Sequence, residues 1–546
     1  MPRNALLLFT VLGPSALALA ATGCSRRSDD RVVGWRGDGG GPIDSDGGRL
    51  PGRDAGRDPV TRVIVTDSAP ADAPDRFGGA DDPSRAPELV YPSDGVIVPP
   101  NMREIEFHYR TAGSTIFELT FRAPALDLRV YIGCPESVGG GCVYTPDDEV
   151  WDTLAAAARG AGAVPYTLRG TDGSSVGTAA EQRITFAEED ITGGLYYWNA
   201  GLGRIMRYEW GRRGAAAEVF LDRGRTGATM CVGCHSVSRD GTRIAVGIDV
   251  PGSTLQTYDV ASRSRVFSRG TASFPPNPQE PTFFSFSPDS RLIVGGAGHG
   301  LDIHHADTGD IAVPDVAANA TMPDWSPDGT HIVYVETATP PPFNSASVSA
   351  GSIATLVLDG ATWRPGPTLV ARAGENNYYP AYSPDGGWVV FNRSPSNTNS
   401  MGDDVEGMIA RVSDAEQWVV AADGSLPPVR LETADGFADS WPKWDPTPYV
   451  DRGRTMFWLS FASRRGYGLR LDRDERSQIW MAAFYPDDAR GGLDPAAPAI
   501  RVPFQELDSS NHLPQWVTSI ERLTCTDDSQ CGGEFCMDGR CYPDLI

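Results

Sequence analysis

Trp325-Ser326-Pro327-Asp328-Gly329, followed by the apolar run His331-Ile332-Val333-Tyr334-Val335, is the stretch that decides the fold. This stretch predicts an aromatic residue followed by a tight turn and a strand. The same order recurs at Tyr382-Ser383-Pro384-Asp385-Gly386, which precedes Trp388-Val389-Val390-Phe391. Proline at the second turn position fixes φ, aspartate caps the turn through its side chain, and glycine tolerates the exit geometry. The repetition predicts several copies of one strand-containing unit.

Four further copies extend the pattern in both directions. Phe286-Ser287-Pro288-Asp289-Ser290 and Val237-Ser238-Arg239-Asp240-Gly241 lie upstream, and Trp444-Asp445-Pro446 and Trp516 look like degraded fifth and sixth copies. The aromatic positions are separated by 49, 39, 57, 62 and 72 residues. Such separations are typical of four-stranded propeller blades with insertions.

A proline two residues before the aromatic position supports this register. It is found as Pro323, Pro380, Pro442 and Pro514. In the first copy, His235 takes the place of this proline, two residues before Val237.

The repeats resemble those of the TolB-like, WD40-like (PD40) β-propeller family. The resemblance implies a six-bladed propeller over residues 211–520, whose last blade is completed by a strand near Glu218 to Leu221. A further sequence feature of that family, found before a blade strand, is matched by Ser463-Arg464-Arg465-Gly466 and Ser477-Gln478-Ile479-Trp480. The fold class predicted for the chain is therefore all-β.

The residues before the propeller divide into two parts. Residues 24–85 are rich in Gly, Asp, Arg and Pro and predict a disordered linker. Residues 86–210 contain short alternating segments such as Ile105-Glu106-Phe107-His108-Tyr109, which predict half-buried strands. This part ends in Gly194-Leu195-Tyr196-Tyr197-Trp198 and a hairpin strand, and it resembles an immunoglobulin-like or fibronectin type III sandwich.

Composition agrees with a turn-rich β fold. Glycine and proline supply 61 and 44 of the 546 residues, above their usual joint share of about 12%. The chain carries 47 basic and 71 acidic residues, a net charge of −24, and Lys443 is its only lysine. A chain of this charge repels a phosphate backbone, so no nucleic-acid partner is expected.

The N-terminus predicts export. Arg3 precedes an apolar run from Ala5 to Ala21, and Ala21-Thr22-Gly23-Cys24 resembles a bacterial lipobox. The resemblance implies that residues 1–23 are a signal peptide and that Cys24 carries acyl chains, which would make the membrane a partner. A plain secretory signal is the alternative. We expect a cell-envelope protein, on the periplasmic side or the surface of the outer membrane.

Cysteines of exported proteins are usually disulfide-bonded or bound to a lipid, a cofactor or a metal. Cys134 and Cys142 flank a Gly-rich loop and predict a local disulfide. Residues 521–546 form a tail that is too short to form a hydrophobic core. Its four cysteines predict two disulfides, for which three pairings are possible, and a zinc site is the alternative. These cysteines are Cys525, Cys531, Cys536 and Cys541.

The remaining pair forms Cys231-Val232-Gly233-Cys234-His235, the attachment signature of c-type haem. Two thiols add to the haem vinyl groups, and the adjacent imidazole ligates the iron. The signature therefore predicts haem c on Cys231 and Cys234 with His235 as proximal ligand. The alternatives are a structural disulfide, a redox pair or a zinc site.

The proline register suggests candidates for the sixth iron ligand, because the corresponding positions of all blades lie around one mouth of the channel. Met322 precedes Pro323, and His512 precedes Leu513-Pro514. Methionine would raise the haem potential and histidine would lower it. His512 is the favoured ligand.

Two functions follow from these observations. The first is an envelope lipoprotein whose propeller carries haem c for electron transfer or redox chemistry. The second is a non-enzymatic propeller that binds a protein or ligand, with Cys231 and Cys234 in a disulfide. No catalytic residues are assigned.

Overall fold

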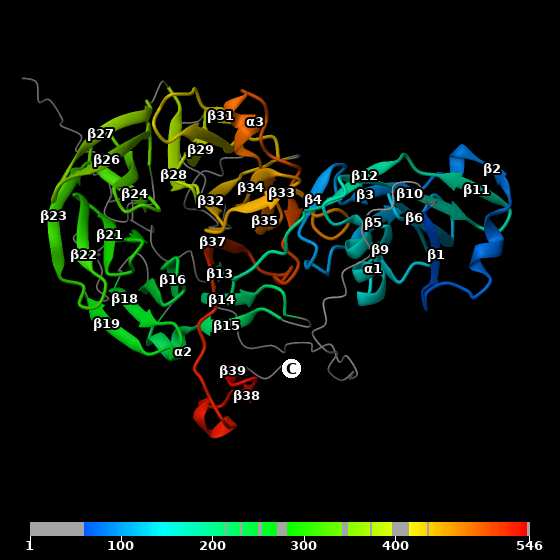
Figure 1. Cartoon of the computed structure of the whole chain (residues 1–546), viewed down its shortest axis with the longest axis horizontal. Helices are drawn as coiled ribbons and strands as arrows, with labels where there is room; N and C mark the ends of the chain where they lie inside the picture. Colours follow the sequence, from blue (N-terminus) through cyan, green and yellow to red (C-terminus); the bar gives the residue numbers. More distant parts are fainter. Residues whose placement is uncertain are drawn as a thin grey trace, which may run out of the picture.

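The computed structural model describes residues 59–212, 216–229, 232–248, 254–269, 281–340, 348–371, 374–395, 414–433 and 436–542. These residues form a β-sandwich domain, a β-propeller of six blades and a small tail (Figure 1). The all-β fold class is therefore confirmed. Among the described residues, no helix has the length and apolar character needed to cross a bilayer.

The repeated turn is held by the same hydrogen bonds in four copies. In each, the serine hydroxyl donates to the aspartate at 2.6 Å and accepts the backbone N–H five residues after the serine. The turn ends with a residue at φ between 61° and 76°, which is glycine in three copies and Ser290 in the second. The serine–aspartate pairs are Ser238–Asp240, Ser287–Asp289, Ser326–Asp328 and Ser383–Asp385.

Five blades follow one another along the chain, each with its first strand at the channel. The first blade has β16 (Val232–Val237), β17 (Arg243–Ile248), β18 (Thr254–Asp259) and β19 (Arg265–Arg269), and the second has β20 (Phe283–Phe286), β21 (Leu292–Ala297), β22 (Gly300–His305) and β23 (Ile311–Ala318). The third blade has β24 (Ala320–Trp325), β25 (His331–Glu336), β26 (Ser352–Asp359) and β27 (Thr362–Val370), and the fourth has β28 (Asn376–Tyr382), β29 (Trp388–Ser394), β30 (Glu416–Ala421) and β31 (Val429–Arg430). The fifth blade has β32 (Ser440–Trp444), β34 (Arg454–Ser463), β35 (Gln478–Phe484) and β36 (Ile500–Arg501), with β33 (Tyr449–Asp451) paired to β34.

The sixth blade closes the ring with strands from both ends of the propeller. Its order is β15 (Glu218–Leu221), β14 (Arg204–Glu209), β13 (Gly194–Asn199) and β37 (Asn511–Val517), with β37 at the channel. The predicted strand near Glu218 to Leu221 is confirmed as part of this blade. The predicted domain boundary at residue 210 is wrong, because β13 and β14 belong to the propeller and not to the sandwich.

Buried charges hold the outer strand of the closing blade. The Glu218 carboxylate accepts from Arg207 Nε at 2.8 Å, and it pairs with Arg522 at 2.7 Å and Arg263 at 3.0 Å. Burial alone would raise the pKa of Glu218, but the charges of Arg207 and Arg522 outweigh it and hold the pKa at about 2. Arg522 begins the C-terminal tail, so this cluster fastens the tail to the propeller.

The N-terminal domain is built from two sheets and helix α1 (Asp148–Ala158). Ring contacts such as Phe107–Phe121 and Tyr109–Phe117 join the sheets in one core. The larger sheet has β1 (Val60–Val65), β7 (Leu126–Ile132), β6 (Ile116–Ala123), β10 (Ala163–Thr171), β11 (Ser175–Thr178), β2 (Ala80–Asp81), β12 (Gln182–Phe186) and β4 (Val96–Val98). The smaller sheet has β3 (Glu88–Tyr91), β5 (Phe107–Arg110), β9 (Gly141–Tyr144) and β8 (Glu136–Val138).

The predicted linker is shorter than expected. Residues 59–85 belong to the sandwich domain: β1 pairs in parallel with β7, β2 pairs with β11, and the short 3-10 helices η1 (Ala73–Phe77) and η2 (Pro83–Arg85) lie between β1 and β3 along the chain. Their Gly, Asp and Pro content reflects turns around these short elements. Residues 24–58 of the predicted linker, Cys24 and the predicted signal peptide lie outside the described residues.

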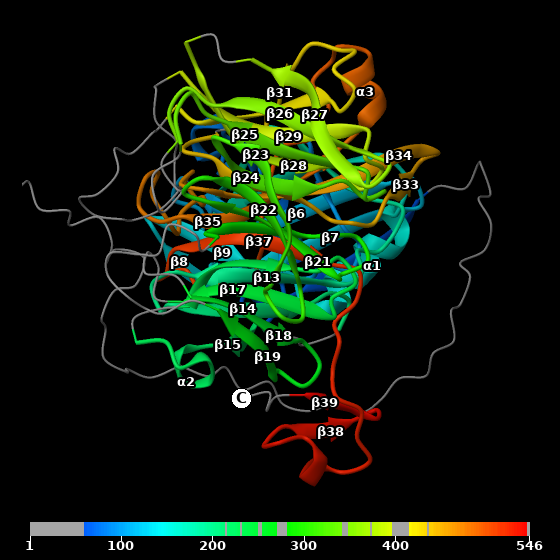
Figure 2. The same cartoon turned by 90° about the vertical axis from the view of Figure 1, so that its left-hand side faces the viewer.

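A buried polar cluster joins the smaller sheet of the sandwich to the propeller. Glu106 accepts from Tyr467 Oη at 2.5 Å and from Nε and Nη2 of Arg470 at 2.8 and 2.9 Å. The fully buried His108 ring contacts Glu106 at 2.8 Å, and its Nδ1 accepts the Leu469 N–H at 3.0 Å. The two domains are therefore in direct polar contact, beside each other in Figure 1 and overlapping in Figure 2.

The cysteine predictions are confirmed where they can be tested. Cys134 and Cys142 form a disulfide. In the tail, Cys525 pairs with Cys536 and Cys531 with Cys541, so disulfides replace the alternative zinc site. The tail adds only η3 (Asp528–Gln530), β38 (Phe535–Met537) and β39 (Arg540–Tyr542), and the propeller adds two helical turns, α2 (Arg223–Thr226) and α3 (Pro486–Arg490).

We predict that Glu218→Gln lowers the free energy of unfolding by about 3–5 kcal/mol, because it leaves Arg207, whose side chain is 2% exposed, without a counter-charge. Glu209→Gln is the matched control: its carboxylate also pairs with Arg522 but is 26% exposed, so it should cost less than about 1 kcal/mol. Urea unfolding of the full chain, followed by tryptophan fluorescence, measures both. Equal losses in the two variants would contradict the role given to Glu218.

Candidate functional site

The inner strands of five blades carry a bulge at the same level of the channel. In β24, for example, the pairing passes from Thr321 directly to Asp324, so that two residues oppose one. The first bulge residue has positive φ in every case, between 43° and 57°. These residues are Cys234, Met322, Tyr379, Trp441 and Leu513. In β20 the ladder is regular.

The second bulge residue is proline in four blades and His235 in the first, as the repeat register predicted. The histidine is therefore part of the inner strand β16, in line with Pro323 and its equivalents. Gly233, just before the bulge, leaves room for a neighbour: a Cβ there would lie 3.2 Å from Cε2 of Trp198 on the closing blade. The geometry of β16 is thus fixed by the repeat and by blade packing.

Aromatic rings close the channel at this level. Phe283 and Trp441 belong to blades on opposite sides of the ring, yet their ring centroids are 6.1 Å apart. Tyr379 contacts both, at 6.1 Å from Phe283 and 4.9 Å from Trp441. We call these three rings the aromatic plug. Because they meet across the axis, the plug closes the channel at this level.

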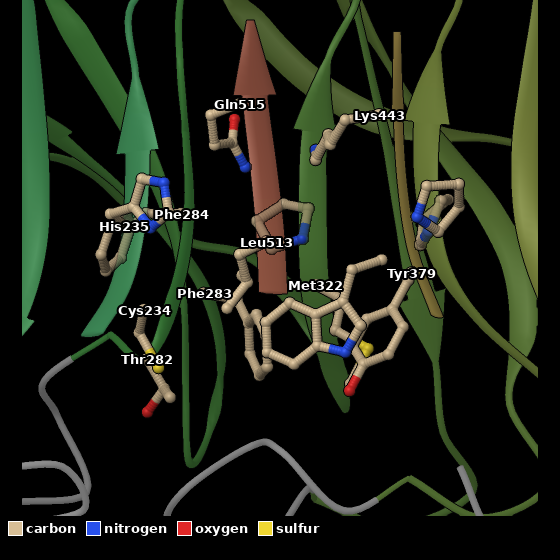
Figure 3. A pocket seen from close by; sticks show the side chains of 14 residues that line it. Cys234, His235, Thr282, Phe283, Phe284, Met322, Tyr379, Lys443, Leu513 and Gln515 are labelled. Carbon is tan, nitrogen blue, oxygen red and sulfur yellow. The ribbon is translucent and has the colours of Figure 1, made fainter. Parts of the chain in front are cut away.

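The aromatic chamber is the cavity beside the plug, and it encloses about 50 Å³. All six blades contribute to its wall, through Cys234, His235, Phe283, Met322, Trp441 and Leu513 among others. Figure 3 shows His235 and Cys234 on neighbouring positions of β16, with Phe283, Met322 and Tyr379 reaching into the same space. Most of this wall is apolar.

His235 is the most unusual group of this chamber. Its side chain is buried, and neither ring nitrogen makes a hydrogen bond of normal geometry with a described residue. Burial lowers the pKa of His235 to about 3, and the nearby Tyr196 backbone opposes this only weakly. The Trp441 indole N–H, in the same wall, is also buried without a partner among the described residues. Buried polar groups are usually hydrogen-bonded, so two unpaired groups in one wall make this chamber a candidate ligand site.

A second cavity, the polar chamber, continues the channel from the end of the aromatic chamber that lies away from the plug. It also encloses about 50 Å³, and it is lined by Ser236, Arg239, Ser285, Asp324, Lys443 and Gln515 among others. Lys443 and Gln515 line both chambers. The Asp324 carboxylate accepts from Lys443 Nζ at 3.1 Å, from Ser285 Oγ at 3.2 Å and from the Tyr382 N–H at 2.9 Å. The only lysine of the chain therefore lies in the channel.

The residues predicted to hold a haem do not all line the same cavity. Cys231 lies outside the described residues. Cys234, His235 and Met322 line the aromatic chamber, as expected from the register. His512 does not: it is buried behind the channel wall, where its ring lies 5.8 Å from that of Trp198. Leu513, directly before Pro514, is the residue equivalent to Met322, so the register does not place His512 in the chamber, and its role as sixth ligand stays a prediction.

The described residues do not fit a haem. A site for a ligand of drug size needs at least about 300 Å³, whereas the aromatic chamber encloses about 50 Å³ and the rings of the plug pack against one another in its wall. Cys234 and His235 are in a strand, not in a helical turn that would place two thiols along one edge of a porphyrin. Haem attachment would require β16 and the plug to move apart.

Sequence reasoning missed the plug and the polar chamber. The residue before each repeat proline lies at the channel, so Tyr379 and Trp441 could have been found by the rule that found Met322. Lys443 directly follows Pro442, and it stood out only as the single lysine. Phe283 had no such signal, because its strand has neither the proline nor the bulge.

Strand pairing and channel geometry define the class of this protein as a six-bladed β-propeller with a plugged channel and a sandwich domain that contacts it. No family model matches the chain, and no curated protein matches it. The propeller predicted from the TolB-like repeats is thus established by the strand order itself.

Solved structures with similarity to the chain include other proteins of several activities. A TolB candidate from Agrobacterium tumefaciens is 16% identical over 57% of this chain and 88% of its own, with a TM-score of 0.33. A 6-phosphogluconolactonase candidate from Bacteroides uniformis is 13% identical over 56% and 81%, with a TM-score of 0.32. Dihydro-heme d1 dehydrogenase NirN in complex with DHE is 15% identical over 62% and 70%, with a TM-score of 0.30. At these values the similarities carry no argument about function.

We predict that His235→Pro makes the protein less sensitive to acid. The unfolded chain protonates this histidine below its ordinary pKa of 6.5, whereas the folded chain does so only near 3. Wild-type stability therefore falls as the pH drops from 6.5 toward 3, by about 1.4 kcal/mol per pH unit. Relative to the variant, the wild type should lose about 2 kcal/mol between pH 7.5 and 5.0.

Urea unfolding of both proteins at both pH values measures this difference, and the other histidines cancel in the comparison. Proline is the substitution of choice because four other inner strands hold it at the equivalent position. A difference between the two proteins that does not change with pH would show that His235 is solvated in solution.

Proposed function

We propose that this protein is an exported, non-enzymatic binding propeller whose ligand site is the aromatic chamber. The observation that carries the proposal is the pair of buried, unpartnered polar groups in one wall, the His235 imidazole and the Trp441 N–H. The imidazole offers one donor and one acceptor, and the indole offers a donor. Around them, the rings of the plug offer stacking surfaces.

The ligand class follows from this lining. A flat apolar body that displaces one ring of the plug would stack on the others, and a polar substituent would satisfy His235 or Trp441. Burial keeps His235 neutral at physiological pH, so the chamber favours a neutral polar group at that point. The bound ligand replaces contacts that the plug makes with itself, so binding and opening of the channel are coupled.

The proposed location is the cell envelope, on the periplasmic side or the outer-membrane surface, with Cys24 as the lipidated anchor. Residues 1–23 and Cys24 lie outside the described residues, so this rests on the lipobox-like sequence. The disulfides Cys134–Cys142, Cys525–Cys536 and Cys531–Cys541 support an oxidising compartment. The membrane would be a partner through the acyl anchor.

The second candidate function is electron transfer or redox chemistry with haem c on Cys231 and Cys234 and with His235 as iron ligand. The motif itself and the unpartnered His235 imidazole favour it. If bound, the haem would supply one-electron chemistry, and this chain would supply the thiols and the proximal imidazole. The small aromatic chamber and the strand geometry of β16 oppose it.

We expect no covalent haem on the full chain produced in an exporting host with c-type haem maturation. The measurements are a pyridine haemochrome spectrum and haem staining of a denaturing gel. A stained band that disappears in the Cys231→Ala/Cys234→Ala double variant would overturn the proposed function in favour of the haem protein. A known c-type cytochrome produced in the same host shows that maturation is active.

We also expect the wild type to bind phenol, used as a probe because it has one flat ring and one hydroxyl that both donates and accepts. Isothermal titration calorimetry should detect binding that Trp441→Leu weakens about tenfold, since stacking contributes about 1 kcal/mol and the indole N–H adds a hydrogen bond. Trp363→Leu, on the outer strand β27, is the control and should leave the affinity unchanged. Absence of wild-type binding at millimolar phenol would contradict the assignment of the chamber.

A further inference from the structure

Two departures from the repeat lie close together in the first blade. His235 replaces the proline of the inner-strand bulge, and Arg239 replaces the proline of the tight turn, which is Pro288, Pro327 and Pro384 in the next three copies. Proline at this turn position presets the backbone and stabilises the fold. A sequence that breaks its own local rule does so most often at a functional site. Both replacements line the channel, but in different chambers.

Arg239 reaches into the polar chamber from the turn. One terminal nitrogen of its guanidinium donates to the Trp325 carbonyl at 2.8 Å, which fixes the direction of the side chain. Within the described part of the chain, Arg239 forms no ion pair within 4.0 Å. Most arginines of this acidic protein do form one, including Arg243, only four residues later, which pairs with Asp259. Arg239 is thus an unneutralised cation in an enclosed space.

The polar chamber carries an excess of positive charge. Arg239 and Lys443 face a single carboxylate, Asp324, and no other charged side chain lines this cavity among the described residues. Asp324 is already used, because it accepts from Lys443, Ser285 and the Tyr382 N–H. Burial lowers the pKa of Arg239 in spite of the nearby Asp324, which shows that the enclosed guanidinium lacks a full counter-charge.

We propose that the polar chamber binds one compact oxyanion, a carboxylate or a phosphate, between Arg239 and Lys443. A guanidinium binds such groups through paired N–H donors, and an ammonium adds a point charge. The Ser236 and Gln515 side chains line the same cavity and supply neutral hydrogen-bonding groups. The cavity of about 50 Å³ has room for about three water molecules, and so for an ion of similar size.

The aromatic plug and the turns define how the ion would enter. The rings of the plug line the aromatic chamber only, the two chambers meet at Lys443 and Gln515, and Pro384 and Pro446 of the turns line the polar chamber. Entry is therefore from the face of the propeller that carries the turns. Since Lys443 lines both chambers, an ion bound to it would change the charge seen by a ligand in the aromatic chamber. The oxyanion site thereby extends the proposed function and names a second ligand class.

Calorimetric titration of the full chain with inorganic phosphate and, separately, with acetate tests the proposal. We expect the wild type to bind at least one ion with a Kd below about 1 mM, and Arg239→Gln to weaken it at least tenfold. Arg239→Lys keeps the charge and should recover part of the affinity. Arg291→Gln is the control, since Arg291 is 85% exposed in the neighbouring blade, and it should bind as the wild type does.

The outcomes separate the possible sources of the ligand. Tighter binding of phosphate assigns the site to phosphorylated ligands, and tighter binding of acetate assigns it to carboxylates. If Arg239→Gln does not fold, Lys443→Gln provides the same test from the opposite wall of the chamber. Failure of both ions to bind below 10 mM, or equal affinity in wild type and Arg239→Gln, overturns the proposal. Because phenol probes the other chamber, either assignment can fail while the other stands.

Discussion

The pairing of β13 with β37 is the interaction on which the rest of the structure depends. It joins residues more than 300 positions apart, such as Leu195 and Trp516, and it brings the inner strands of the first and last blades together. Each blade packs only on its neighbours, so an open ring would leave two apolar blade faces in water. Glu218 and its three arginine partners hold the outer edge of the same blade. Closure also reaches the site, because Trp198 of β13 packs against Gly233 in β16.

Once the ring is closed, the site follows from repetition. A bulge at one level of five inner strands places five side chains around one axis. Positive φ at a residue other than glycine costs roughly 1 kcal/mol or more. The chain accepts this cost at Met322, Tyr379, Trp441 and their equivalents, and the proline that usually follows fixes the next φ. The side chains of Tyr379 and Trp441 placed in this way contact each other, and Phe283 of the regular strand β20 meets them across the channel. A repeat that is merely structural in each blade thereby builds a plug that no single blade could form.

The sequence predicted those parts of the fold that local chemistry determines. The Ser-Pro-Asp-Gly turns, the proline register and the tail disulfides depend on neighbouring residues, and all were found. The end of the sandwich domain was misplaced, because Gly194–Asn199 is an aromatic strand in either domain, and only its distant partner β37 decides between them. For the site, the register located His235 and Met322. His512 was preferred for its chemistry, but Leu513 occupies the equivalent position. Arg239 was read only as a variant turn residue, since its side chain acquires its role in the assembled channel.

The same reasoning explains how a haem signature can arise in a strand. Cys234 holds the first bulge position and His235 the second, and Gly233 is small because Trp198 lies against it. Every described residue of the motif therefore has a place in the repeat without a cofactor. What the repeat does not explain is the choice of side chains: an imidazole where four blades have proline, and an arginine where three turns have proline. Both exchanges give up backbone rigidity, and both put a hydrogen-bonding group into the channel. Both exchanges lie in the first blade, and that blade stands beside the seam where the ring closes.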